Sequence, residues 1–265
     1  MTSAPLPQND AFEIDGADRP GPALILCDHA SNRVPPEIGD LGLSAADMAR
    51  HIAFDIGAAD VARALGRALA APVILSRFSR LVIDPNRGAD DPTLVMKLYD
   101  GSIIPKNRLV TPDDIAGRQA AYYTPYHDAI ATQITTMIAA GRVPHLLSLH
   151  SFTPQLRGRP QRPWHVGILW DRDDRLAGPL IARLRGDDGL VVGDNAPYSG
   201  QLQGDTMYQH GTARGLPHVL IELRNDLIST EGAAETWAAR LAHHIAPLIP
   251  VAAQKGPANG PTNRN

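Results

Sequence analysis

Short hydrophobic runs in this chain each end on a polar residue of a type that hydrolytic metal sites use. Runs of this length, alternating with helix-like segments, predict buried strands of a mainly parallel sheet. Because ligands of open α/β sheets bind beyond the carboxyl ends of the strands, we expect these polar residues to converge on one crevice. The four runs and the polar residues that follow them are 23–27 with Asp28 and His29, 81–83 with Asp84, Asn86 and Arg87, 146–149 with His150, and 219–221 with Glu222.

Segments of helical periodicity lie between these runs. Residues 52–71 are rich in alanine and carry apolar side chains at near-helical spacing, which predicts an amphipathic helix packed on the sheet. The sequence from Thr111 to Asp114 has a capping residue, a proline and two acids, and it predicts the start of a long helix that ends near residue 140, with Pro125 as a candidate bend. Further helices are expected at 173–184, 206–214 and 230–246, further strands at 72–75, 166–170 and 190–192, and a loop with one helical turn at 88–112.

This alternation predicts an α/β fold: a single three-layer domain with a mainly parallel, mixed sheet and helices on both of its faces. The chain of 265 residues shows no internal repeat and no second compositional regime. Residues 1–20 are polar and contain prolines, and residues 251–265 are rich in glycine, proline and asparagine. We therefore expect a flexible N-terminal segment at 1–20, one domain at 21–250 and a disordered tail at 251–265.

Composition narrows the classes of partner. The net charge of −3 and the charged fraction of 20% give no reason to expect a nucleic acid or an anionic membrane as partner. The single cysteine, Cys27, excludes an intrachain disulfide and suits a reducing compartment. No signal-peptide pattern and no apolar run near the ~20 residues of a membrane span is visible, so we expect a cytoplasmic protein.

The familiar motifs of other hydrolases and of nucleotide-binding enzymes are absent: there is no G-x-S-x-G, P-loop, G-x-G-x-x-G, C-x-x-C or H-E-x-x-H. The strand-end residues instead suit metal-assisted hydrolysis at a carbonyl group. His29 and His150 are candidate ligands of a divalent metal, which we expect to be Zn²⁺, and Glu222 is the candidate general base. Arg87 is suited to bind a substrate carboxylate bidentately, with Asn86 beside it.

The order of these parts resembles the zinc carboxypeptidase superfamily, and within it the N-formylglutamate amidohydrolase (deformylase) family more closely. The resemblance covers residues 22–248. The stretches that carry it are Asp28-His29-Ala30-Ser31-Asn32, HIAFDIG (51–57), residues 79–87, YYTPYHDA (122–129), SLHSFTP (148–154), GDNAPYSG (193–200) and LPHVLIELRNDL (216–227).

The resemblance implies a zinc-exopeptidase-like fold and hydrolysis of the N-formyl, or similar N-acyl, amide of an amino acid such as N-formylglutamate. The expected partner is then a small N-acyl amino acid. The resemblance also implies a catalytic role for His210, as a substrate or oxyanion contact, and substrate-binding roles for His127 and Arg224. We expect Asp84 to orient Arg87 or a ligating histidine.

One departure concerns the third metal ligand. Where carboxypeptidases carry a glutamate three residues after the first histidine, this chain has Asn32, a weak neutral ligand. Asp55, expected one helical turn after His51 on the same face, is our choice for the missing anionic ligand, and Asn32 is the alternative. The metal set is therefore His29, Asp55 and His150.

Two alternatives to the amidohydrolase remain at this stage. The first is a hydrolase of another amide, ester or peptide bond on the same scaffold. The second is a protein without activity that has lost the metal and binds carboxylates, an alternative that Asn32 keeps open.

Overall fold

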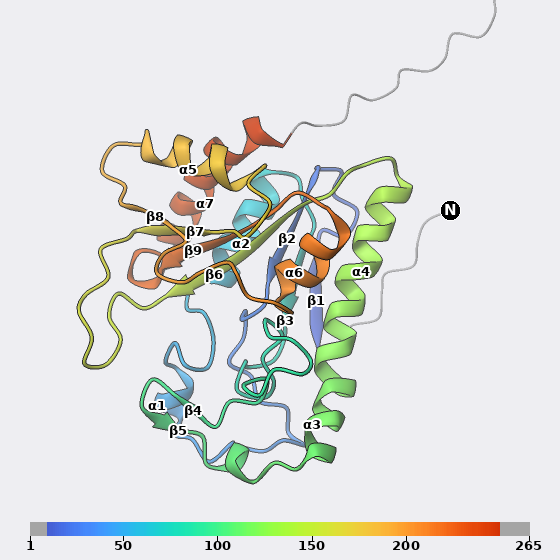
Figure 1. The fold of residues 1–265 in the computed structure, drawn as a ribbon, viewed down its shortest axis with the longest axis vertical. Coiled ribbons are helices and arrows are strands. Elements are labelled where there is room, and N and C mark those ends of the chain that lie inside the picture. Colours follow the sequence, from blue (N-terminus) through green and yellow to red (C-terminus); the bar gives the residue numbers. More distant parts are fainter. Residues whose placement is uncertain (1–9, 250–265) are drawn as a thin grey trace, which may run out of the picture.

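The fold is seen in a computed structural model that describes residues 10–249. A seven-stranded mixed sheet forms its centre, in the order β1-β3-β2-β6-β9-β7-β8 (Figure 1). Strands β3, β2, β6 and β9 run parallel to one another, whereas β1 pairs antiparallel with β3, and β7 pairs antiparallel with β9. The strands are β1 (Phe12–Asp15), β2 (Ala23–Cys27), β3 (Val73–Ser76), β6 (His145–Phe152), β7 (Val166–Leu169), β8 (Val192–Asp194) and β9 (His218–Arg224).

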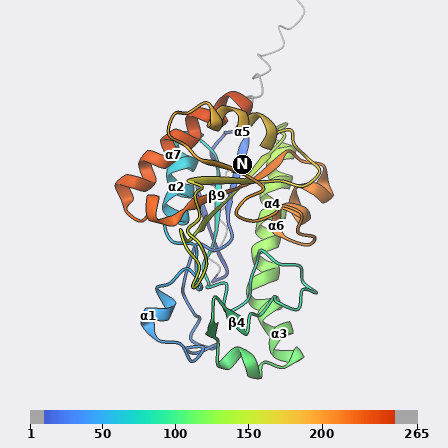
Figure 2. The same ribbon diagram turned by 60° about the vertical axis from the view of Figure 1, so that its left-hand side comes forward.

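Helices cover both faces of the sheet, which confirms the predicted three-layer α/β fold. Figure 2 shows α2 (Ala58–Ala68), α5 (Ala177–Arg185) and α7 (Glu231–Ile245) on one side of the strands, and α4 (Thr124–Ala139) and α6 (Thr206–His210) on the other. None of the helices among residues 10–249 is long and apolar enough to span a bilayer.

Strand β2 illustrates why the hydrophobic runs are continuous rather than alternating. Its alternate residues Ala23, Ile25 and Cys27 pack in the core beneath α2 and α7, and Leu24 and Leu26 pack in the core beneath α4. All five residues are fully buried. A strand covered on both faces needs an apolar residue at every position.

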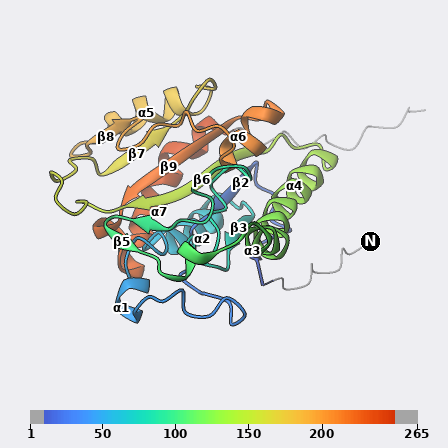
Figure 3. The same cartoon turned by 60° about the horizontal axis from the view of Figure 1, so that its bottom comes forward.

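The segments that follow β2 and β3 gather beyond the carboxyl ends of these strands, at the bottom of Figure 1 and facing the viewer in Figure 3. They contain α1 (Ala45–Met48), the two-stranded hairpin of β4 (Leu98–Tyr99) and β5 (Ser102–Ile103), and α3 (Pro112–Arg118). The loop predicted at 88–112 therefore contains this hairpin in addition to a 3-10 turn at Lys106–Leu109.

The helix predicted from residue 111 begins as expected, with a capping box between Thr111 and Asp114. It does not run unbroken to residue 140, because a π-helical turn at Gln119–Tyr123 separates α3 from α4. A π turn changes which side chains face inward, and Tyr123 in this turn and Tyr126 after it contact the functional site described below.

Two further expectations about local structure are wrong. Residues 81–83 are buried but form no strand: Asn107 donates a hydrogen bond to the carbonyl of Leu81 and Arg118 to that of Val82, so side chains satisfy this backbone in place of a neighbouring strand. Residues 52–57 are turns, and α2 begins only at Ala58, after Gly57 with a φ of 79°.

The segment 1–20 was expected to be flexible. Within it, Phe12–Asp15 forms the edge strand β1, paired with β3. Residues 1–9 and the predicted tail at 251–265 lie outside the described residues.

Candidate active site

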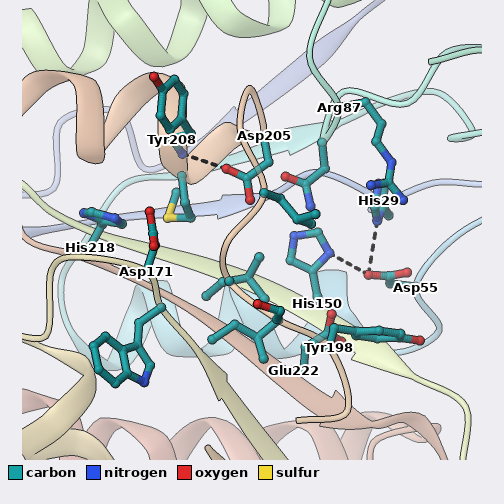
Figure 4. Close-up of a pocket in the computed structure, with 18 of the residues that line it drawn as sticks. His29, Asp55, Arg87, His150, Asp171, Tyr198, Asp205, Tyr208, His218 and Glu222 are labelled. Carbon is teal, nitrogen blue, oxygen red and sulfur yellow. Dashed lines mark hydrogen bonds and ion pairs between the residues drawn. The ribbon is translucent and has the colours of Figure 1, made fainter. Parts of the chain in front are cut away.

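A cavity of about 300 Å³ opens at the carboxyl edge of the parallel strands. His29 follows β2, His150 lies near the end of β6, and Glu222 lies directly opposite His150 in the β6–β9 register. All three line the cavity, so the strand-end residues do converge as the hydrophobic pattern predicts (Figure 4).

His29, Asp55 and His150 form a buried cluster at one end of this cavity. Asp55 Oδ2 lies 3.3 Å from His29 Nδ1 and 2.9 Å from His150 Nδ1. One donor atom from each residue lies within 4.8 Å of the other two. Asp55 is held in place by its backbone, whose N–H donates to the carbonyl of His29 at 2.9 Å.

Two further carboxylates fix the orientation of the imidazole rings. His29 Nε2 donates to Asp84 Oδ1 at 2.7 Å, and His150 Nε2 donates to Asp28 Oδ2 at 3.0 Å. Burial alone would raise the pKa of Asp28, but the hydrogen bond and charge of His150 lower it to about 2. The Nδ1 atom of each ring faces Asp55. Hydrogen bonds to Asp28 and Asp55 hold the pKa of His150 well above its ordinary value, although burial acts in the opposite direction.

This donor set fits a divalent metal. Two imidazole nitrogens and one carboxylate are a common ligand set of catalytic zinc, and carboxylates on the remote ring nitrogens are typical of such sites. Asp55 Oδ1 and His51 Nδ1, 3.7 Å apart, are buried without a hydrogen-bond partner among the described residues.

Asn32 lies outside the cluster. Its side-chain amide donates to the carbonyl of Met48 at 2.9 Å. Asp55 reaches the cluster from a turn rather than from the predicted helix, although His51 does lie beside it as expected.

Glu222 is the buried acid of the cavity. Its side chain faces the cavity from β9, and its Oε2 atom has no hydrogen-bond partner within residues 10–249. Burial raises its pKa to about 7, although the nearby His150 acts in the opposite direction. A carboxylate with a pKa near neutrality is suited both to accept and to return a proton.

Asn86 and Arg87 also line the cavity. The side-chain oxygen of Asn86 accepts from the backbone N–H of Thr206 at 3.1 Å, which leaves its NH₂ group as a donor. Arg87 is partly exposed, and its Nε atom lies 3.9 Å from Asp84. The guanidinium therefore keeps donors available for an anionic ligand.

Three residues expected to bind substrate or take part in catalysis do not line the cavity. Arg224 Nε donates to Asp226 at 2.8 Å, beyond the end of β9. His127 and His210 form a buried pair, with His127 Nδ1 2.9 Å from His210 Nε2. Because His127 Nε2 must donate to the carbonyl of Pro85, its Nδ1 accepts from His210, and both rings are neutral.

Side chains of the π turn and of helix α4 hydrogen-bond to residues that build the site. Tyr126 OH donates to Asp28 Oδ1 at 2.9 Å, and Tyr123 OH donates to the carbonyl of Arg87 at 2.8 Å. His127, one residue after Tyr126, holds the carbonyl of Pro85 at 3.0 Å. These bonds position the loop that carries Asn86 and Arg87. His127 therefore contacts the backbone of this loop at Pro85 and does not line the cavity.

Several further residues of the cavity were not predicted from the sequence. Arg80 is buried, donates to Asp84 Oδ2 at 2.8 Å and lies 3.7 Å from Asp55. Its position four residues before Asp84 is a signal that could have been noticed. Asp171 and Asp205 also line the cavity, but they follow or precede short elements that carry no motif.

Fold and site together define a class: an α/β protein with a candidate hydrolytic metal centre at the carboxyl edge of its sheet. The family model described as N-formylglutamate amidohydrolase matches residues 21–229, and the chain belongs to this family. The resemblance inferred from the motifs is thereby confirmed. No curated protein sequence matches the chain significantly.

Two crystal structures show the same fold over most of their length. One is a gene product of Agrobacterium tumefaciens, 37% identical, with a TM-score of 0.86, 90% of this chain and 94% of that chain covered. The other is N-formylglutamate amidohydrolase from Ralstonia eutropha JMP134, 23% identical, with a TM-score of 0.65 and 91% and 96% covered. The second likeness supports the fold alone.

Proposed function

We propose that the protein is a metal-dependent amidohydrolase that cleaves the N-formyl, or a similar small N-acyl, amide of an amino acid. Membership of the N-formylglutamate amidohydrolase family supports this reaction class. The observation that carries the proposal is the shared cavity of Glu222, buried and without a partner on Oε2, and the His29–Asp55–His150 cluster.

In this proposal His29 and His150, through Nδ1, and Asp55, through a carboxylate oxygen, would hold the metal, most suitably zinc. When bound, the ion would supply the Lewis acidity that polarises the scissile carbonyl and lowers the pKa of water. Asp84 and Asp28 keep the two imidazoles in the tautomer that such binding requires.

Glu222 carries the proton of the reaction. Its carboxylate accepts a proton from the attacking water as the new C–O bond forms, and returns it to the amine nitrogen as the C–N bond breaks. The products of an N-formyl substrate are then formate and the free amino acid. The pKa of about 7 suits both halves of this transfer near neutral pH.

Arg87 and Asn86 orient the substrate. The guanidinium of Arg87 binds the α-carboxylate, and the free NH₂ group of Asn86 adds a further donor. His127 and His210 contribute by positioning, since they hold the backbone at Pro85 rather than the cavity surface.

The test is Glu222→Gln, which keeps the size of the side chain and removes the base. We expect kcat for formate release from N-formyl amino acids to fall by about 10²–10⁴-fold. Zinc content and urea unfolding should stay at the wild-type level. Glu231→Gln, an exposed glutamate in the first turn of α7, is the matched control.

Near-full activity of Glu222→Gln on a substrate that the wild type turns over would overturn the mechanism. A panel of N-formyl, N-acetyl and N-carbamoyl amino acids identifies the acyl group. Absence of turnover throughout the panel, together with absence of bound metal, would favour a carboxylate-binding protein without activity.

A further inference from the structure

The cavity extends along β9, away from the metal cluster. Residues at alternate positions of a strand face the same side, and His218, Leu220 and Glu222 all line the cavity. Four residues of strand at about 3.3 Å each place His218 about 13 Å from Glu222 along the strand. This is well beyond the reach of a formyl group, so the cavity has room for a second part of the substrate.

The end of the cavity that lies away from the metal cluster, here called the far end, can be located from the pairing of β7 with β9. Leu169 pairs with Leu220, and the chain continues from Leu169 towards the start of β9, so that Asp171 comes beside His218. Figure 4 shows Asp171 and His218 across His150 from the side that carries His29 and Asp55. The cavity therefore has a catalytic end and a far end.

Between the two ends the wall is apolar. Leu169, Met207 and Leu220 are buried members of the core beneath α4 and also line the cavity. This stretch suits a hydrocarbon chain. The carboxyl group of Asp205, which also lines the cavity, accepts from the backbone N–H of Tyr208 at 2.7 Å.

Asp171 supplies the charge at the far end. The one ion-pair partner described for it is its neighbour Arg172, whose Nε lies 3.7 Å away and whose side chain is 82% exposed to solvent. His218 is engaged by other groups: its Nδ1 lies 2.8 Å from the carbonyl of Leu216 and 3.6 Å from Asp173 Oδ2, and its Nε2 lies 3.1 Å from Thr212 Oγ1. Tyr208, on α6, adds an aromatic ring to this end.

The arginines of the cavity lie at the catalytic end. Within residues 10–249, Arg80 and Arg87 are the only arginines or lysines that line it, and both lie within 3.9 Å of Asp84. Arg80 is already paired with Asp84, which leaves Arg87 as the cation available to a substrate. A substrate with two carboxylates would thus have one cation, Arg87, for its α-carboxylate. Its second carboxylate would point towards the carboxylate of Asp171.

We propose that the substrate is an N-formyl or small N-acyl amino acid whose side chain has an apolar stem and ends in a cation, such as a lysine-like side chain, rather than glutamate. The proposal rests on the proposed function for the α-carboxylate at Arg87 and the acyl group at the metal cluster. The stem lies along Leu169, Met207 and Leu220, and the terminal ammonium pairs with Asp171. Asp171 is then a specificity-determining residue.

The experiment measures both turnover and binding. Zinc-loaded wild-type protein is assayed for formate release from Nα-formyl-lysine, Nα-formyl-norleucine and Nα-formyl-glutamate, and binding of the same compounds to zinc-loaded Glu222→Gln is measured by calorimetry. We expect kcat/KM and affinity to fall in that order, with at least tenfold between lysine and glutamate. Asp171→Asn should reduce the lysine-to-glutamate ratio about tenfold, and Asp171→Lys should reverse it.

Asp174→Asn, an exposed aspartate of the same loop, is the control and should leave the ratio unchanged. If the glutamate compound is preferred in both assays, or if Asp171→Asn leaves the ratio unchanged, this inference is overturned while the proposed function stands. If the lysine compound binds best but none of the three is hydrolysed by the wild type, the specificity is supported and the proposed function fails.

Discussion

Substitution of Asp84 tests how the site is held together, because this residue connects His29, a proposed metal ligand, to the buried Arg80. Its Oδ1 accepts from His29 Nε2 at 2.7 Å and from the backbone of Asn86 at 2.9 Å, and its Oδ2 accepts from Arg80 at 2.8 Å. Burial alone would raise the pKa of Asp84, but Arg80 and His29 hold it well below its ordinary value. The residue is therefore an anion in the folded protein.

Asp84→Asn removes this charge and replaces one acceptor with a donor. If the amide oxygen faces His29, the NH₂ group meets the guanidinium of Arg80. If the amide turns the other way, its NH₂ group faces His29 Nε2 and drives the ring to the other tautomer, which removes the Nδ1 lone pair from the cluster. Neither orientation preserves both contacts.

The magnitude follows from the buried pair. Removing one partner of a buried ion pair costs about 3–5 kcal/mol. Asp55 lies 3.7 Å from Arg80 and compensates part of the loss, so we expect about 3 kcal/mol in the free energy of unfolding. Loss of a carboxylate behind a metal-bound histidine typically lowers metal affinity 10–100-fold, and we expect the same for zinc here.

Urea unfolding of the metal-free protein and competition titration with a zinc chelator measure the two effects separately. Arg80→Met combined with Asp84→Asn should recover part of the lost stability, because no buried cation is then left without its partner. A loss below about 1 kcal/mol for Asp84→Asn, together with unchanged zinc affinity, would refute the reasoning.

Two further predictions concern single side chains of the cavity. Arg87→Lys replaces the bidentate donor with a point charge, so KM for N-formyl amino acids should rise about tenfold while kcat changes little; steady-state kinetics check this, and an unchanged KM contradicts the carboxylate-binding role. Burial raises the pKa of Asp205 to about 7, so the folded state binds this proton more tightly than the unfolded chain, and the wild type loses stability through this group as pH rises from about 4 to 7. Asp205→Asn keeps an acceptor for the Tyr208 N–H and should gain stability relative to the wild type at pH 8 compared with pH 5 in urea unfolding; an equal difference at both values contradicts this.

The convergence of His29, His150 and Glu222 could be predicted from the sequence because strand ends in a parallel sheet share one edge. Hydrophobic runs mark such strands when both faces are covered, as they are for β2. The same rule failed at residues 81–83, where side chains of Asn107 and Arg118 satisfy a buried loop. An apolar run indicates that a segment is buried. Whether the segment is a strand depends on the groups to which its backbone is hydrogen-bonded.

Other parts of the site depend on geometry that the pattern does not contain. The π turn at Gln119–Tyr123 sets which residues of α4 reach the site, and it places His127 behind Pro85. Asp171 belongs to the cavity because β7 runs antiparallel to β9, and the direction of a short strand cannot be inferred from its composition. The motif resemblance predicted that His127 binds substrate, but it did not indicate that this side chain contacts the backbone of Pro85 and does not line the cavity.

The proposed activity depends most on a divalent ion held by His29, Asp55 and His150. Elemental analysis of protein purified without chelator and then equilibrated with zinc measures this directly, with Asp60→Ala, an exposed aspartate in the first turn of α2, as the control for Asp55→Ala. We expect about one equivalent of zinc in the wild type and in Asp60→Ala, and a loss of most of it in Asp55→Ala. Wild-type protein that takes up no metal, or Asp55→Ala that retains a full equivalent, would contradict the account.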